Sequence, residues 1–221
     1  MAGSTIAICS WKGGCGKTTL CTALAVNLAA MRYRVAVIDA DPNQAFVTWH
    51  KIAEAPPLTV TSCIDHNEIV SHAAAQAETH DVTLIDTAGF ANQTAVFAIG
   101  AADLVLIPAM PDRNSVLEAR KTSRQVDSVS QIARRSIPYR IVLSRWDPRG
   151  LSERAAIEDI EGSSLPRLTW HLSDLSAYQK YTFSGSMPHT GIVAIQARRI
   201  IEEIMALGAI APKPTAAEAV A

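Results

Sequence analysis

The sequence predicts a doubly wound α/β fold, in which a mostly parallel sheet is covered by helices on both faces. Two observations indicate this fold. Short apolar runs of strand length recur along the chain, and amphipathic segments of helical length lie between them. Because parallel strands need long crossover connections, a regular alternation of strand and helix indicates a parallel sheet that is buried on both faces.

The expected strands are short runs with the composition of buried sheet. In chain order they are TIAICS (5–10), RVAVIDA (34–40), LTVTSC (58–63), DVTLIDT (81–87), ADLVLIPA (102–109) and YRIVLSR (139–145). We expect a seventh strand at RLTWHL (167–172), near the end of the alternating pattern.

The segments between these strands place apolar residues three and four positions apart, which is the spacing of one helix face. They are KTTLCTALAVNLAAMR (17–32), NQAFVTWHKIAEA (43–55), HNEIVSHAAAQAE (66–78), NSVLEARKTSRQVDSVSQIARR (114–135) and LSERAAIEDIEG (151–162). Two more helices are expected after the seventh strand, the second being TGIVAIQARRIIEEIMALG (190–208).

We expect residues 1–208 to form one domain and residues 209–221 to form a disordered tail. A chain of 221 residues with 48% hydrophobic and 19% charged residues is typical of a globular protein. Neither an internal repeat nor a domain linker interrupts the pattern. The closing residues APKPTAAEAVA lack a pattern that would build a core.

The composition argues against membrane insertion and against cysteine chemistry. No apolar run approaches the roughly 20 residues of a membrane-spanning helix, and the first residues lack a charged, cleavable leader. The sequence therefore predicts a cytoplasmic protein without a membrane partner. The cysteines lack C-x-x-C spacing, so metal binding and disulfides are not predicted for Cys9, Cys15, Cys21 and Cys63.

The charged residues are segregated along a chain whose formal net charge is only −1. Residues 1–112 contain 5 Lys and Arg against 10 Asp and Glu, residues 113–154 contain 10 against 4, and residues 155–221 contain 5 against 7. These counts give −5, +6 and −2. One contiguous segment is therefore basic, as expected of an anion-binding surface.

The segment CSWKGGCGKTTL (9–20) nearly matches the phosphate-binding pattern G-x-x-x-x-G-K-[ST]. Its end matches, but Trp11 stands where the first glycine is expected, and Lys12 adds a second lysine. The segment lies between an expected strand and an expected helix, which is the context in which this pattern binds phosphate. The alternative is a glycine-rich turn without a ligand.

The residue types in this loop suit a nucleotide with Mg²⁺. Gly13, Gly14 and Gly16 let successive backbone N–H groups turn toward phosphate oxygens at the start of a helix. Lys17 would reach the β- and γ-phosphates, and the Thr18 hydroxyl would ligate Mg²⁺.

Two other strand ends carry carboxylates that could complete such a site. DVTLIDTAG ends on Asp86 with Gly89 after it, which suits a metal-binding aspartate followed by a loop that senses the γ-phosphate. RVAVIDADPNQ ends on Asp39 and Asp41, which share a side of an extended chain. Alternatively, Asp41 only caps the helix that follows.

These motifs resemble the ParA/MinD family of deviant Walker A ATPases, which have a P-loop NTPase fold. The resemblance rests on KGGCGKTT, VIDADPNQA, LIDTAGF and VLIPAMPD, in that order, and covers roughly residues 4–205. The length and the lack of an N-terminal helix-turn-helix are similar to the small partition ATPases, including the VirC-type proteins of transfer plasmids.

The resemblance implies a role for each residue of the site. It implies that Lys12 crosses to the partner's phosphates in a face-to-face, ATP-dependent homodimer, and that Asp41 positions the attacking water. The implied catalytic residues are Lys12, Lys17 and Asp41. The implied nucleotide contacts are Lys12, Gly13, Gly14, Cys15, Gly16, Lys17, Thr18 and Thr19. Mg²⁺ would be held by Thr18, Asp39 and Asp86.

The adenine site is expected in the loop VLSRWDPRG, because relatives cradle the base after the sixth strand. Arg145 and Trp146 are therefore candidates for contact with the base. The alternative is that both residues serve packing or lie on the surface.

The resemblance implies a ParA-type ATPase that positions plasmid or chromosomal DNA or another cargo, and is stimulated by a ParB-like or adaptor partner and by DNA. Such a protein would associate with the nucleoid in its ATP state. Within the basic segment, candidates for non-specific contacts to double-stranded DNA are Arg134, Arg135, Arg149 and Arg154. The alternatives are a metabolic P-loop ligase or kinase of related fold, and a MinD-like spatial regulator without a membrane helix.

Overall fold

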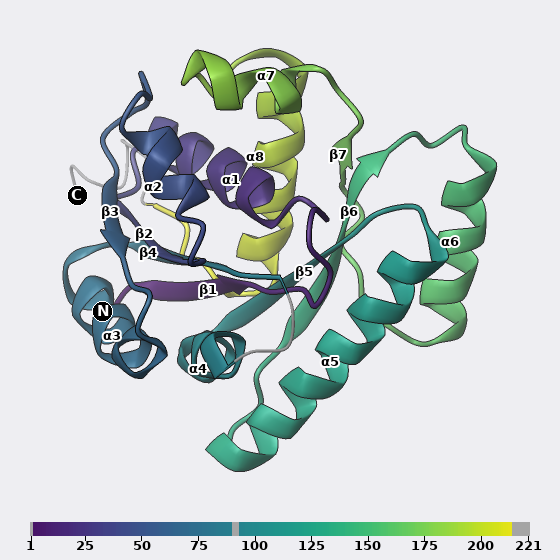
Figure 1. Cartoon of the computed structure of the whole chain (residues 1–221), viewed down its shortest axis with the longest axis horizontal. Coiled ribbons are helices and arrows are strands. Elements are labelled where there is room, and N and C mark those ends of the chain that lie inside the picture. Colours follow the sequence, from purple (N-terminus) through teal and green to yellow (C-terminus); the bar gives the residue numbers. More distant parts are fainter. Residues whose placement is uncertain (1, 90–92, 214–221) are drawn as a thin grey trace, which may run out of the picture.

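The computed structural model describes residues 2–89 and 93–213, and the strands within them form one parallel sheet (Figure 1). They are β1 (Ser4–Ile8), β2 (Val35–Ala40), β3 (Thr59–Ser62), β4 (Val82–Thr87), β5 (Leu104–Ala109), β6 (Tyr139–Trp146) and β7 (Leu172–Ser173). Their order across the sheet is β3-β2-β4-β1-β5-β6-β7, and every described pairing is parallel.

Helices cover both faces of this sheet, which confirms the predicted doubly wound α/β fold. They are α1 (Lys17–Ala30), α2 (Ala45–His50), α3 (Ile69–Thr79), α4 (Gln93–Ala101), α5 (Arg113–Ala133), α6 (Leu151–Gly162), α7 (Ala177–Ser184) and α8 (Gly191–Ala206), with a 3₁₀ helix η1 (His66–Glu68). Figure 1 shows α1, α2, α7 and α8 on one side of the sheet and α3, α4 and α5 on the other. Helix α6 packs beside α5, to which Arg120 and Asp159 tie it by an ion pair of 2.9 Å.

The central strands β1, β2, β4 and β5 are buried on both faces because successive residues belong to different hydrophobic cores, whereas the edge strand β3 is exposed or half-buried along its length. In β1, Ile6 and Ile8 join the core with α1 and α8, whereas Ala7 joins the core with α4 and α5. The same division separates Val37 from Ile38 in β2. This is why the strand sequences are apolar throughout rather than alternating.

Helix α4 lies where no helix is expected from the sequence. Its residues QTAVFAIGA are mostly apolar, and Thr94, Ala95, Ala98 and Ile99 are all buried. A helix that is buried on most sides lacks the polar stripe by which an amphipathic helix is identified. The three residues before it, 90–92, lie outside the described residues.

The seventh strand is shorter than expected, because its middle residues bond to a helix instead of the sheet. The backbone N–H groups of Thr169 and Trp170 donate to the Glu203 carboxylate of α8, at 2.8 and 2.7 Å. Arg167 forms only an isolated bridge to Ile141 of β6. The predicted strand 167–172 is therefore corrected to β7 at its carboxyl end.

Residues 209–213, which the sequence assigns to a disordered tail, contact the domain. Ile210 is only 1% exposed and belongs to the core with α1 and α8. The Tyr33 hydroxyl donates to the Ala211 carbonyl (3.1 Å) and accepts from the Lys213 N–H (3.0 Å). Residues 209–213 thus pack against the domain, and the remaining expected tail, 214–221, lies outside the described residues.

All four cysteines are free and buried, in agreement with the expectation that none forms a disulfide. Within residues 2–89 and 93–213, no helix is both long and apolar enough to cross a membrane.

The parallel arrangement gives the sheet two chemically distinct edges. The carboxyl ends of all strands meet at one edge, where α1, α5 and α6 begin, and the amino ends meet at the other. The glycine-rich loop follows β1 and therefore lies at the carboxyl edge, beside the loops that follow β4 and β5. Ligands of open α/β sheets bind at this edge, where neighbouring connections run to opposite faces.

Candidate nucleotide-binding site

A cavity of about 650 Å³ opens at the carboxyl edge. Its walls come from five loops that are far apart in the sequence, with lining residues in the segments 13–19, 41–43, 88–89, 144–145 and 172–179. Of the predicted site residues, those that line it are Gly13, Gly14, Gly16, Lys17, Thr18, Thr19, Asp41 and Arg145. The volume is that of a site for a ligand of drug or cofactor size.

The glycine-rich loop has the backbone that phosphate binding requires. Gly14 and Gly16 have φ of 72° and 94°, in the left-handed region that favours glycine. Helix α1 begins at Lys17, and no side chain caps its N-terminus among the described residues. Its first N–H groups and its positive end are thus directed at the cavity without a competing acceptor.

Cys15 supports the loop from the side away from the cavity. Its side chain is buried and donates from Sγ to the Lys12 carbonyl (3.2 Å). The Ser144 hydroxyl of β6 donates to the Cys15 carbonyl at 2.7 Å. Only the backbone of Cys15 is therefore left for the predicted nucleotide contact.

The two lysines of the loop point in different directions. Lys17 is 6% exposed, lines the cavity and donates from Nζ to the Lys12 carbonyl at 3.2 Å. Lys12 is missing from the described residues that line the cavity, and its Nζ instead donates to both oxygens of Asp112, at 2.9 and 2.7 Å. Asp112 is the N-cap of α5 and also accepts from the Ser115 N–H. The Lys12 side chain thus lies outside the cavity.

Trp11, which replaces the first glycine of the pattern, anchors the loop to α5. Its indole N–H donates to Gln125 Oε1 at 2.6 Å, and its backbone N–H donates to the Thr122 hydroxyl at 3.2 Å. The Lys121 ammonium lies 5.8 Å from the ring centroid. These contacts give the tryptophan a structural role outside the phosphate site.

Asp86 is a buried carboxylate without a hydrogen-bond partner among the described residues. It is fully buried at the end of β4, and neither of its oxygens is satisfied. Burial raises its pKa to about 7, against the opposing influence of the Thr18 hydroxyl and of Lys17. An orphaned acidic oxygen next to a phosphate loop suits a hard cation, so Asp86 and Thr18 fit Mg²⁺.

Asp39 is also buried, but backbone groups already occupy its oxygens. It accepts from the Val47 N–H at 2.9 Å and from the Asp41 N–H at 3.2 Å. Its pKa is raised by burial, while the bonds from these amides act in the opposite direction. Asp39 is the register partner of Asp86 on the neighbouring strand. The geometry thus places Asp39 beside the predicted metal ligand and ties its carboxylate to the start of α2.

Asp41 lines the cavity and does not cap the helix that follows it. The N-cap of α2 is Gln44, in a left-handed conformation with φ of 50°. The Asp41 carboxylate instead accepts from the Asn43 N–H at 2.8 Å, within the turn before the helix. One carboxylate oxygen takes part in this turn, and Asp41 remains half-buried at the cavity wall.

Gly89 brings the loop after β4 directly against the phosphate loop. A Cβ atom at this position would lie 2.9 Å from the Gly13 Cα and 3.0 Å from the Gly13 nitrogen. Only glycine therefore allows this approach. A displacement of either loop is transmitted to the other through this contact.

On the side of the cavity expected to hold the base, one of the two candidates lines the wall and the other is buried. Arg145 is exposed, has φ of 51° and lines the cavity. Trp146 is 3% exposed and belongs to the core with α5 and α6, so the packing alternative holds for it.

The adjoining wall, formed by β7 and α7, was not expected from the sequence. Its lining residues are Leu172, Ser173, Asp174, Leu175, Tyr178 and Gln179. The Tyr178 hydroxyl donates to Gln196 Oε1 of α8 at 3.0 Å, which fixes the ring at the wall. The expected strand at 167–172 is the signal that could have identified this wall, because its carboxyl end had to lie at the same edge.

The four candidate DNA-binding arginines do not form one cluster. Arg134 and Arg135 follow the C-terminus of α5 at the amino edge, whereas Arg149 and Arg154 lie around the N-terminus of α6 at the carboxyl edge (Figure 1). Arg135 donates to the Gly100 and Ala102 carbonyls at 2.7 and 2.9 Å, and so supports the end of α4. The two pairs of candidates therefore lie at opposite edges of the sheet.

The parallel sheet, the glycine-rich loop with a second lysine and the strand-end carboxylates define an ATPase of the ParA/MinD type. The model of the VirC1 protein family matches residues 4–211. The chain therefore belongs to the VirC1 family.

Two relatives illustrate the range of this similarity. The chain is 30% identical to the virC1 protein of Rhizobium rhizogenes over 183 residues, which are 79% of each chain. It is 29% identical over 189 residues to the maintenance of carboxysome distribution protein A of Halothiobacillus neapolitanus, covering 82% of this chain and 84% of the relative.

Solved structures with this fold serve more than one function. The ATP complex of a McdA variant from Cyanothece superposes with a TM-score of 0.78 at 18% identity, covering 97% of this chain and 99% of that one. A cobyrinic acid a,c-diamide synthase of Mycobacterium smegmatis, with an ATP analog and magnesium bound, gives a TM-score of 0.74 at 17% identity, covering 92% and 94%. At these identities the similarity shows the fold alone.

Proposed function

We propose that this chain is a positioning ATPase of the ParA type, which uses ATP and Mg²⁺ to form a face-to-face homodimer on non-specific double-stranded DNA. A ParB-like or adaptor protein on the cargo would stimulate hydrolysis and release. The ATP state would then be found on the nucleoid, and the ADP state free in the cytoplasm. The observation that carries the proposal is the position of Lys12, outside the cavity of its own subunit.

Lys12 is not needed as a ligand of the nucleotide in its own subunit, because Lys17 already lines that cavity. A cation at the mouth of the loop can serve the phosphates of a second subunit that faces it. Charge supplied in this way stabilises the transferring phosphoryl group and makes the dimer depend on ATP. The carboxyl edge, which holds the cavity, is therefore the proposed dimer face.

The ion pair between Lys12 and Asp112 is weak enough to break, which would free Lys12. The two side chains are 24% and 39% exposed. Partly exposed pairs of this kind contribute only about 0–1 kcal/mol, so the multiply charged phosphates of a facing nucleotide can displace Asp112. Asp112 would then keep Lys12 oriented until ATP and a second subunit are present.

Each remaining residue of the site has a part in this function. Lys17 and the N-terminus of α1 hold the phosphates, and Thr18 and Asp86 hold Mg²⁺, which supplies charge neutralisation when bound. Asp41, at the cavity wall, orients the attacking water. Gly89 couples the loop after β4 to the phosphate loop through their contact at Gly13.

The proposed DNA surface combines the carboxyl-edge arginines of two subunits. Arg149 and Arg154 lie on the proposed dimer edge, so closure would place two copies near each other. Arg149 is paired with Asp147 at 3.1 Å but remains exposed, so DNA phosphate can compete for it. Arg134 and Arg135 lie at the other edge and would contribute only if the DNA extends along α5.

The test is DNA binding as a function of nucleotide and salt. We expect arbitrary duplex DNA to shift strongly with ATP and Mg²⁺ and little with ADP, because the dimer doubles the number of aligned cations. The affinity should fall steeply with salt and be indifferent to sequence. Equal, weak binding in both nucleotide states would overturn the proposal. It would favour the metabolic alternative, a P-loop ligase or kinase, for which the shared fold with a diamide synthase is the argument.

Charge reversals locate the surface. The double variant Arg149→Glu and Arg154→Glu should abolish the ATP-dependent shift while ATP binding persists. The exposed Lys51, which follows α2 on the β3 side of the sheet, supplies the matched control, and Lys51→Glu should bind DNA normally. Loss of DNA binding in the control would show that net charge alone, and not this surface, decides the result.

A second pair of variants isolates Lys12. Lys12→Gln should bind ATP but fail to dimerise, as measured by light scattering. Asp112→Asn keeps an acceptor for the Ser115 N–H but weakens the hold on Lys12. It should therefore dimerise at lower ATP concentration. Normal ATP-dependent dimers of Lys12→Gln would exclude the role in the facing subunit.

A further inference from the structure

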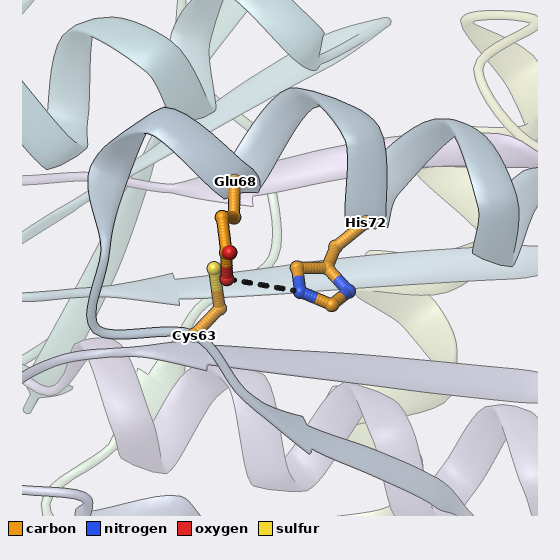
Figure 2. A group of neighbouring side chains, drawn as sticks. All are labelled: Cys63, Glu68 and His72. Atoms are coloured by element: carbon orange, nitrogen blue, oxygen red, sulfur yellow. Dashed lines mark ion pairs between the residues drawn. The ribbon is translucent and has the colours of Figure 1, made fainter.

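A second group of metal-ligating side chains lies outside the cavity. Cys63 directly follows β3, Glu68 ends η1, and His72 lies in the first turn of α3. One ligand atom from each lies within 4.8 Å of the others. Figure 2 shows the Cys63 sulfur and the His72 ring on two sides of the Glu68 carboxylate. The fold thus joins a thiol, a carboxylate and an imidazole that are spread over ten positions of the sequence.

The local fold holds this arrangement in place. The Cys63 N–H donates to the Asp39 carbonyl at 2.9 Å, which continues the β3–β2 pairing by one residue. Glu68 and His72 are four positions apart, and His72 Nε2 lies 3.6 Å from Glu68 Oε2. Residues at this spacing on a helical segment share a face.

Two neighbouring titratable residues are engaged elsewhere. Asp65 accepts from the backbone N–H of Asn67 at 2.9 Å and so caps η1. The ring of His66 packs against Phe97, with 5.4 Å between centroids. The group with converging ligand atoms therefore consists of Cys63, Glu68 and His72.

The three ligands differ in their exposed fractions, from the buried Cys63 to the exposed Glu68. Cys63 is 2% exposed, while the side chains of His72 and Glu68 are 37% and 62% exposed. Burial, followed by the Glu68 and Asp65 carboxylates, raises the pKa of the Cys63 thiol. A bound dication would remove this penalty by neutralising both the thiolate and the carboxylate. Solvent reaches the site over the exposed ligands, so an ion can enter.

We propose that Cys63, Glu68 and His72 bind one divalent transition-metal ion, of the class to which Zn²⁺ belongs. A thiolate with an imidazole selects a borderline or soft ion over Mg²⁺, and the carboxylate is compatible with Zn²⁺. Three protein ligands leave the fourth tetrahedral position to water. On binding, the sulfur–metal bond forms as the thiol proton leaves to solvent, without any redox change.

The site is independent of the nucleotide function, so it can be tested without ATP. The full chain, freed of metal with a chelator, is titrated with Co²⁺ alone. We expect one Co²⁺ per chain, a thiolate-to-cobalt charge-transfer absorption and the visible bands of tetrahedral coordination. Excess Mg²⁺ should leave the spectrum unchanged, whereas Zn²⁺ should abolish it by displacement.

Variants assign the ligands. Cys63→Ser should lose the charge-transfer absorption, and His72→Ala and Glu68→Gln should each weaken Co²⁺ binding by about 10-fold or more. The controls are Cys21→Ala and His80→Ala, which remove a buried thiol and an imidazole outside the group and should bind Co²⁺ normally. If Cys63→Ser fails to fold, the Co²⁺ affinities of His72→Ala and Glu68→Gln decide whether the group binds metal. A wild-type spectrum without thiolate absorption, or ligand variants that bind like wild type, would show that Glu68 and His72 form an ion pair only.

Discussion

The two ends of β4 carry aspartates in opposite situations. Asp81, just before the strand, accepts from the Arg34 backbone at 2.8 Å and its guanidinium at 2.7 Å, and pairs with Lys213 at 3.0 Å. Asp86, near the other end of the strand, is fully buried and has no partner among the described residues. The same residue type is thus saturated at the amino edge and orphaned at the carboxyl edge.

The two environments move the carboxyl pKa values in opposite directions. Partial burial alone would raise the pKa of Asp81, but the bonds from Arg34 and Lys213 hold it well below its usual range. Burial raises the pKa of Asp86 to about 7. The amino edge therefore contributes stability, whereas the carboxyl edge bears an energetic cost that a bound cation would offset. Substitutions that affect binding should be separable from those that affect folding.

The largest expected effect belongs to the carboxyl edge. Lys17→Ala should lower ATP affinity by about three orders of magnitude, or roughly 4 kcal/mol, because the β- and γ-phosphates lose their buried cation. Isothermal titration calorimetry measures this loss. The fold should persist, since the partner of the Lys17 ammonium among the described residues is the Lys12 carbonyl of the same loop. Near-normal affinity would remove Lys17 from the phosphate site.

Asp86→Asn should stabilise the nucleotide-free protein and destroy its response to Mg²⁺–ATP. Asparagine imitates the protonated carboxyl, so at pH 8 the gain should be on the order of 4 kcal/mol, from the difference between the native pKa of about 7 and the unfolded pKa. Urea denaturation measures it. A variant that is less stable than wild type would contradict the orphaned state of Asp86.

The pH dependence of the stability difference between Asp86→Asn and wild type tests the direction of the pKa shift of Asp86. A carboxyl whose native pKa is raised loses stability as pH rises from its unfolded pKa, about 4, to its native value, about 7. The advantage of Asp86→Asn should therefore be small near pH 4, grow up to pH 7 and stay constant above it. Asp39 is present in both proteins and cancels from the comparison.

Asp41→Ala should retain ATP binding and lose turnover by about 100-fold, or roughly 2.7 kcal/mol in the barrier, because the attacking water is no longer oriented. The ATP dimer should accumulate on size-exclusion columns. A phosphate-release assay gives the rate. Unchanged turnover would leave Asp41 with only its turn, in which it accepts from the Asn43 N–H.

Local patterns were sufficient to predict the sheet and the phosphate loop. Six predicted runs became strands β1 to β6, and the central ones are almost entirely apolar because they are buried on both faces. Helix α4 was not predicted because it is apolar on most sides. The start of β7 was predicted too early because the Glu203 carboxylate accepts from the N–H groups of Thr169 and Trp170. Both errors arise from tertiary partners that are distant in sequence.

In the candidate site, too, some residues could be predicted from local motifs and others could not. The loop glycines and the strand-end aspartates occur in motifs, so the sequence was enough to find them. The pairing of Lys12 with Asp112 joins residues 100 positions apart, and the meeting of Cys63 with His72 depends on how η1 turns the chain. No local pattern specifies either contact, because each results from the packing of separate elements.

The smallest expected effect tests the amino edge. Asp81→Asn should lower the free energy of unfolding by about 1–2 kcal/mol at pH 7, because Arg34 and Lys213 lose their shared carboxylate. A carboxyl with a lowered native pKa contributes stability above its unfolded pKa, about 4, and loses it as pH falls. The deficit of the variant should therefore shrink as the pH falls below 4. Urea denaturation over this range measures it.

The control for Asp81 is Asp127→Asn, on the exposed side of α5, which should leave stability unchanged. ATP affinity should be normal in both variants, because Asp81 stands at the opposite end of β4 from the cavity. Residues 211–213 should become more susceptible to proteolysis in Asp81→Asn, since the Lys213 ammonium loses its carboxylate while the Tyr33 hydroxyl still holds the backbone. A loss of ATP affinity that matches the loss of stability would show that the two edges are coupled through the strand. It would contradict the expectation that substitutions affecting binding are separable from those affecting folding.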